Sequence, residues 1–117
     1  MTAEEEAPHI NAIRRSVAAG FRFLHLRESE SVAVTAIHAQ RLGGGVVETY
    51  TFRHMTEAVA ARFRAEDYPR SDPLWQQQGT VEAVITALLD LPPHGAPGAP
   101  ATTRLASSSF WLPGALI

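Results

Sequence analysis

Residues 41–54 read RLGGGVVETYTFRH, and this stretch decides the fold class. Its three consecutive glycines separate two segments rich in β-branched residues, 31–40 and 46–53. Glycine readily adopts the positive φ angles that a tight hairpin turn requires, and β-branched residues favour strands. We therefore predict that the two segments form an antiparallel hairpin.

The register of that hairpin decides which side chains share a face of the sheet. A turn centred on Gly43 and Gly44 would place Ile37 opposite Tyr50. Opposed side chains on neighbouring strands contact one another and stabilise the sheet. We expect helices to cover the face that carries Ile37, Tyr50 and Phe52.

A further strand is predicted before the hairpin. Residues 21–28, FRFLHLRE, alternate in polarity better than they follow a helical period. The link to segment 31–40 is short and charged, which favours another antiparallel turn. Together the three segments predict a three-stranded antiparallel meander.

Three other segments have helical spacing: 8–19, 55–67 and 80–91. In the second, Met55, Val59 and Phe63 recur every four residues, and in the third Thr80 can cap a continuous apolar stripe. The prediction is an α+β fold in which two or three helices pack on one face of the meander. Its second face would be exposed and carry four small apolar residues: Val32, Val34, Ala36 and Val47.

The chain divides into three parts by composition. Residues 1–91 form the predicted compact α+β domain, 92–103 (PPHGAPGAPATT) a linker, and 104–117 an apolar C-terminal tail. The large apolar side chains of the tail are Phe110, Trp111, Leu112, Leu116 and Ile117. Burying each would be worth about 2 kcal/mol, so another surface should cover them. That surface could be the tail's own domain, an identical subunit or a groove on a different protein.

Composition argues against several classes of protein. The net charge of −2 gives no basic footprint for nucleic acid, and the absence of cysteine excludes disulfides and thiolate metal sites. No apolar run is long enough to span a membrane, and the acidic N-terminus lacks the features of a signal peptide. We expect a cytoplasmic protein, and the use of arginine without lysine, with much alanine, glycine and proline, suggests a bacterium with GC-rich codons.

No motif for catalysis or cofactor binding is present. The glycine run lacks the lysine and the following helix of a phosphate-binding loop, and no two of the five histidines have metal-ligand spacing. No cofactor or metal is therefore expected. A pocket between sheet and helices could be lined by His25, Glu48 and Tyr50, with Glu48 or His25 as a base.

Two functional hypotheses follow. The first is a small accessory or regulatory protein that acts through protein–protein interaction, as a homodimer, with the tail as its partner-binding segment. The alternative is a small-molecule-binding domain or minor enzyme that uses the pocket near His25, Glu48 and Tyr50. The lack of catalytic motifs favours the first.

Overall fold

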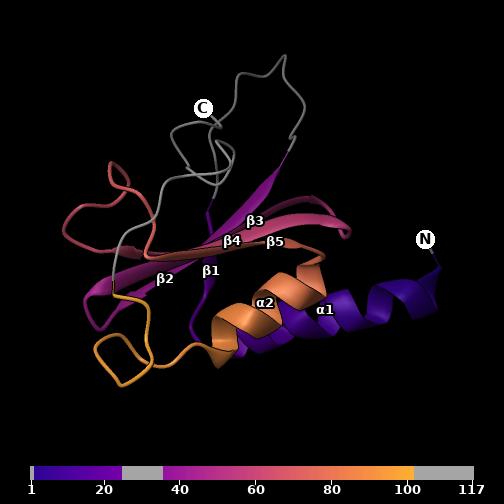
Figure 1. Cartoon of the computed structure of the whole chain (residues 1–117). Coiled ribbons are helices and arrows are strands. Elements are labelled where there is room, and N and C mark those ends of the chain that lie inside the picture. Colours follow the sequence, from indigo (N-terminus) through magenta and orange to yellow (C-terminus); the bar gives the residue numbers. More distant parts are fainter. Residues whose placement is uncertain (1, 25–35, 102–117) are drawn as a thin grey trace, which may run out of the picture.

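A computed structural model describes residues 2–24 and 36–101 of the 117-residue chain. These residues form an α+β fold in which two helices pack on one face of an antiparallel sheet (Figure 1). The described sheet has five strands in the order β1-β2-β3-β4-β5, so the prediction of a three-stranded meander had too few strands. The elements are α1 (Ala3–Ala18), β1 (Arg22–Phe23), β2 (Ile37–Gly43), β3 (Val46–His54), β4 (Glu57–Arg64), β5 (Trp75–Gly79) and α2 (Val81–Asp90).

Helix α1 begins earlier than the predicted segment 8–19. Thr2 caps it by accepting a hydrogen bond from the backbone N–H of Glu5, and its first turn contains three glutamates. Negative charge at this end is favoured by the helix dipole. Pro8 therefore lies inside the helix rather than in its first turn. Gly20, with φ of +104°, follows the C-terminal end of the helix.

The glycine run forms the β2–β3 hairpin turn, but the register differs from the predicted one. Gly43 pairs with Val46, so the turn is centred on Gly44 and Gly45, and Ile37 lies opposite Phe52 rather than Tyr50. Three adjacent glycines allow more than one turn centre, which explains the error. Because the shift is two residues, the same side chains still share a face.

The strand segments before the hairpin are only partly described. Of the predicted strand 21–28, the structure describes β1 (Arg22–Phe23), which pairs with Gln40 and Ala39; residues 25–28 lie outside the described part. The predicted strand 31–40 is replaced in the described residues by β2, which begins at Ile37 and continues to Gly43.

The predicted helix 55–67 is wrong, because residues 57–64 form strand β4. A spacing of four residues fits a helix, but it also keeps side chains on one face of a strand, where the period is two. Val59 and Phe63 do share one face, with Ala61 between them, while Ala58 and Ala60 face the helices. The apolar spacing of this segment therefore reflects the two-residue period of a strand and not the period of a helix.

The C-terminal elements agree better with the sequence. Trp75 begins β5, which forms one edge of the described sheet. Helix α2 is capped by Thr80, whose hydroxyl accepts from the N–H of Ala83 at 3.1 Å. Proline at 92 and 93 follows its end.

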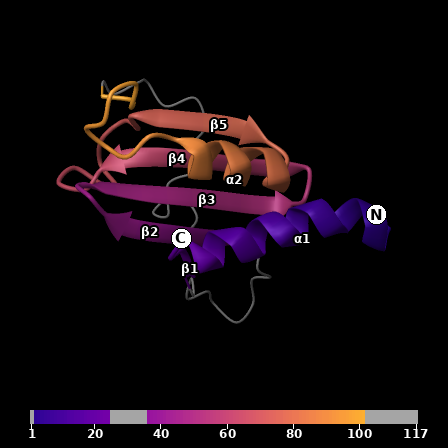
Figure 2. The same cartoon turned by 90° about the horizontal axis from the view of Figure 1, so that it is seen from below.

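The main core lies between the sheet and the helices (Figure 2). Tyr50 is fully buried at its centre, with ring centroids 5.5 Å from Phe21 and 6.3 Å from Phe52. The Tyr50 hydroxyl lies 2.7 Å from Ser16 Oγ of α1, which satisfies both buried polar groups. We call this side of the sheet the helix face.

The opposite side, the second face, is also buried. Val59 and Phe63 have no exposed surface, and Tyr68, from the segment after β4, packs against Phe63 with ring centroids 4.9 Å apart. Val47 lies opposite Phe63 and is 3% exposed, and Ala36 is 7% exposed. The predicted exposed patch is therefore wrong for these two residues; Val32 and Val34 lie outside the described residues.

Candidate functional site

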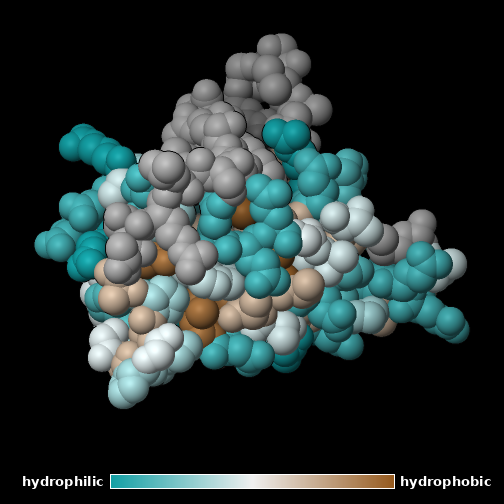
Figure 3. All heavy atoms as spheres, viewed as in Figure 1, coloured by the Kyte–Doolittle hydropathy of each residue, from teal (hydrophilic) through white to brown (hydrophobic). Residues whose placement is uncertain are grey.

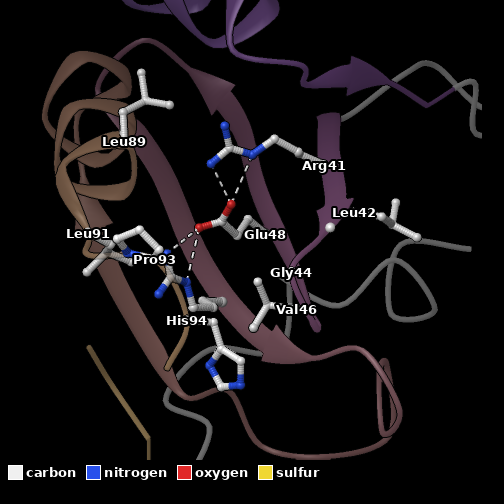
Figure 4. A pocket seen from close by; sticks show the side chains of 11 residues that line it. Arg41, Leu42, Gly44, Val46, Glu48, Leu89, Leu91, Pro93 and His94 are labelled. Carbon is white, nitrogen blue, oxygen red and sulfur yellow. Dashed lines mark hydrogen bonds and ion pairs between the residues drawn. The ribbon is translucent and has the colours of Figure 1, made fainter. Parts of the chain in front are cut away.

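A row of three charged side chains crosses the helix face at one end of the sheet. Glu48 of β3 lies directly opposite Arg41 of β2 and Arg62 of β4. Its Oε1 accepts from Arg41 Nε and Nη2 at 3.0 and 2.6 Å, and its Oε2 from Arg62 Nε and Nη2 at 3.0 and 2.7 Å (Figure 4). Both carboxylate oxygens are thus held by charge-assisted hydrogen bonds.

The two arginines also connect the sheet to the helices. Arg41 Nη1 donates to the carbonyl of Ala19, just past α1, at 2.8 Å. Arg62 Nη1 donates to the carbonyl of Pro92, just past α2, at 2.7 Å. Cations are favoured at these C-terminal ends because the helix dipole is negative there. The Arg41 guanidinium also lies over the ring of Phe21, 4.8 Å from its centroid.

A cavity of about 400 Å³ adjoins this row. Glu48 and Arg62 are 4% and 3% exposed, and the side chain of Arg41 is 30% exposed. The residues that share the cavity wall with these three include Leu42, Val46, Leu89, Leu91, Pro93 and His94. We call it the arginine–glutamate cavity. It combines an apolar wall with a charged one, as small-molecule sites do.

The three residues of the predicted pocket have different positions. Glu48 lines the arginine–glutamate cavity. Tyr50 is not among the residues that line it: its ring is in the core, and burial raises the pKa of its hydroxyl, an effect that the hydrogen bond to Ser16 opposes. His25 lies outside the described residues. The structure therefore brings only Glu48 to the cavity among the described members of that set.

Arg41 and Arg62 were missed by the sequence reasoning. Arg41 and Glu48 are equidistant from the centre of the glycine turn, so the correct register would have paired them. Arg62 was not identified as a partner of Glu48 because its segment was predicted to be a helix, and a helix would not place it beside Glu48. The signal was present in the sequence but required the right turn centre and the right period.

The second face carries a buried histidine. His38 is 1% exposed, and its Nδ1 lies 2.7 Å from Thr51 Oγ1. Burial lowers its pKa to about 4, an effect that the side chain of Gln40 opposes. Burial also raises the pKa of Tyr68 to about 12.

Several large apolar side chains of α1, β1, β2 and the residue after β1 are exposed. The large apolar residues that are at least one-third exposed in the described ranges are Ile10, Val17, Phe23, Leu24, Ile37 and Leu42. We call Phe23, Leu24 and Ile37 the apolar edge, because β1 is at one end of the strand order and β2 is next to it. Phe23 lies opposite Ala39, so it shares a face with Ile37 two residues along β2, and both are 44% exposed.

The opposite edge of the described sheet has a different character. Strand β5 carries three consecutive glutamines, Gln76 to Gln78, and none of the exposed large apolar residues just named. In the view of Figure 3 the hydrophobic areas are small and separated by hydrophilic residues. The two edges of the sheet therefore differ in polarity.

No helix in residues 2–24 or 36–101 is long and apolar enough to cross a membrane. In the same ranges, no three acidic or histidine side chains are grouped so that they could hold a metal ion.

Comparison with known proteins gives no relative: no family model, no curated protein and no solved structure matches the chain. Two features of the described residues could bind a partner or a ligand: the apolar edge and the arginine–glutamate cavity.

Proposed function

We propose that this protein is a small accessory or regulatory module that acts by protein–protein interaction and forms a homodimer through its apolar edge. The observation that carries the proposal is the exposure of three large apolar side chains at the apolar edge: Phe23, Leu24 and Ile37. We place it in the cytoplasm of a bacterium because of its composition, with no cysteine and with arginine in place of lysine.

The chemistry of the apolar edge suits a second copy of the chain. Phe23 and Ile37 are each 44% exposed although they lie beside the aromatic core; the ring of Phe23 is 6.4 Å from that of Tyr50. Exposed large apolar side chains that lie next to one another favour burial against another chain. A two-fold axis at this edge would bring Phe23 and Ile37 of both copies together, as an isologous interface requires.

Binding, rather than catalysis, is the proposed activity. Glu48 is the one acidic residue among the described residues that line the arginine–glutamate cavity, and both of its oxygens accept hydrogen bonds from arginine. A carboxylate held in this way has no oxygen left to take a proton from a substrate. The tail residues Phe110, Trp111, Leu112, Leu116 and Ile117 stay a predicted partner-binding segment, outside the described residues.

Solution mass tests the proposed dimer. Light scattering at high micromolar concentration should give twice the chain mass for the natural protein and one chain mass for the double variant Phe23→Ser, Ile37→Ser. The loss follows because serine removes the apolar area that the interface would bury. Gln77→Ser, on the β5 edge, is the matched control and should stay dimeric.

A chain that lacks residues 104–117 separates the edge from the tail in the same measurement. It should remain folded and dimeric, and lose only the capture of other proteins. A natural protein that is monomeric, or a dimer that is lost on tail deletion but kept in the edge variant, would refute dimerisation through the apolar edge.

A second candidate function is the binding of a small molecule. It is favoured by the arginine–glutamate cavity, whose volume of about 400 Å³ is in the range of small-ligand sites.

A further inference from the structure

We infer that the arginine–glutamate cavity binds a small organic carboxylate, held chiefly by Arg41. The inference rests on the second candidate function, small-molecule binding, and is independent of the proposed dimer. Its basis is a surplus of hydrogen-bond donors and of positive charge beside an apolar wall.

The donor surplus is on the two guanidinium groups. A guanidinium has five N–H groups, and the hydrogen bonds described above use three on Arg41 and three on Arg62. Arg62 is 3% exposed, so bulk water has little access to its remaining N–H groups. Each guanidinium nitrogen already has one partner, and a ligand oxygen in the cavity would accept a hydrogen bond from an N–H group that these contacts leave over.

The charge balance favours an anion. Two arginines and one glutamate are among the residues that line the cavity. A second cavity, of about 380 Å³, shares Arg41 and Leu42 with the first and adds Arg22, and none of its described lining residues is acidic. The described residues that line the two cavities therefore include three arginines and one glutamate.

The helix ends reduce this excess without removing it. The carbonyls of Ala19 and Pro92 accept from Arg41 and Arg62, and each helix C-terminus contributes about half of a negative charge. Two such ends offset roughly one of the two surplus positive charges. An anion remains favoured over a neutral or cationic ligand.

The shape and the wall of the cavity select a carboxylate with an apolar body. A guanidinium edge presents parallel N–H groups that match the two oxygens of a planar carboxylate. Leu89, Leu91 and Val46 give the neighbouring wall an apolar surface (Figure 4). Arg41 is the accessible donor, since 30% of its side chain is exposed.

Nuclear magnetic resonance of the full chain, labelled with ¹⁵N, tests the ligand class. The chain is titrated with benzoate, with benzamide as its neutral analogue and with phenyl phosphate as an anion of different geometry. Benzoate should shift the Nε–Hε signals of Arg41 and Arg62 in a saturable way. Benzamide and phenyl phosphate should bind at least tenfold more weakly, because charge-assisted, geometrically matched hydrogen bonds are lost.

Two variants test the position of the ligand. Arg41→Gln should weaken benzoate binding roughly tenfold or more, while the pair of Arg62 and Glu48 keeps the buried charges balanced. Arg14→Gln removes an exposed arginine elsewhere and should bind as the natural protein does. Leu91→Trp fills the cavity without a change of charge and should also abolish binding.

The possible failures are distinguishable. Benzamide that binds as tightly as benzoate, or an Arg41→Gln variant with unchanged affinity, would overturn the carboxylate assignment but leave small-molecule binding in place. No saturable shift with any of the three probes would overturn both. If Arg41→Gln does not fold, Leu91→Trp still tests the position of the ligand, and the comparison of benzoate with benzamide still tests the carboxylate assignment. The edge variant Phe23→Ser, Ile37→Ser should bind benzoate normally, so the dimer is tested separately.

Discussion

His38 illustrates how one side chain depends on the burial of the second face. Its Nδ1 lies 2.7 Å from Thr51 Oγ1, and its Nε2 has no hydrogen-bond partner among the described residues. Placing a proton on this ring would bury a charge without a counter-ion. Burial accordingly lowers its pKa from 6.5 to about 4.

The low pKa of His38 predicts a loss of stability in acid. Between pH 6.5 and pH 4 the unfolded chain binds a proton that the folded chain does not, so the free energy of unfolding falls as the pH falls. The contribution is complete above pH 6.5, and its loss amounts to about 3 kcal/mol at pH 4. Urea unfolding from pH 4 to pH 8 measures it.

A matched pair of variants assigns this acid sensitivity. His38→Gln should flatten the dependence on pH in that range, whereas His54→Gln, at an exposed histidine, should keep it. Equal slopes for His38→Gln and the natural protein would show that His38 is not the source.

Among the elements, α2 and the β2–β3 turn have chemical end signals and were predicted correctly, whereas strand β4 has none and was predicted as a helix. Thr80 and the prolines after α2 mark its two ends, and the glycine run marks the β2–β3 turn. Strand β4 has no such signal, and its apolar residues recur at an even spacing that both a helix and a strand satisfy.

The same ambiguity hid most of the candidate site. Glu48 was identified from its apolar neighbours on β3, but Arg41 and Arg62 become its partners only through strand pairing. Strand pairing is a long-range property that depends on the position of the turn. Three adjacent glycines can each take part in the turn, so the sequence does not determine its centre.

The hairpin turn gives a prediction at the scale of the element. Gly44 has φ of +61°, and nothing lies within 4 Å of a Cβ built there. Gly44→Ala should lower the free energy of unfolding by about 1 kcal/mol through backbone strain alone. Gly44→Asn should cost less, because asparagine tolerates this conformation. Equal stabilities of all three proteins in urea would contradict the argument.

On the scale of the whole molecule, the charged row joins the two layers. Arg41 connects Glu48 to the end of α1, and Arg62 connects it to the end of α2. A buried ion pair adds little net stability compared with an apolar pair, but removal of one partner leaves an uncompensated buried charge. Glu48 is therefore the residue whose loss should loosen both helices from the sheet at once.

Glu48→Gln should lower the free energy of unfolding by about 3 to 5 kcal/mol, the usual cost of breaking a buried ion pair. Glu57→Gln is the control, since Glu57 lies 3.7 Å from Arg53 in a pair whose side chains are 49% and 44% exposed. That change should cost less than about 0.5 kcal/mol. Denaturant unfolding compares the two, and similar small losses would show that Glu48 does not hold the layers together.

The contrast between the two margins of the sheet limits the size of any assembly. Phe23 and Ile37 flank one margin, while glutamines occupy the other. In the proposed dimer, the apolar edges of both chains are buried at the symmetry axis. The glutamine-rich edges stay exposed and favour contact with water over contact with each other. Assembly should therefore stop at two chains, and a higher protein concentration should give neither filaments nor larger rings.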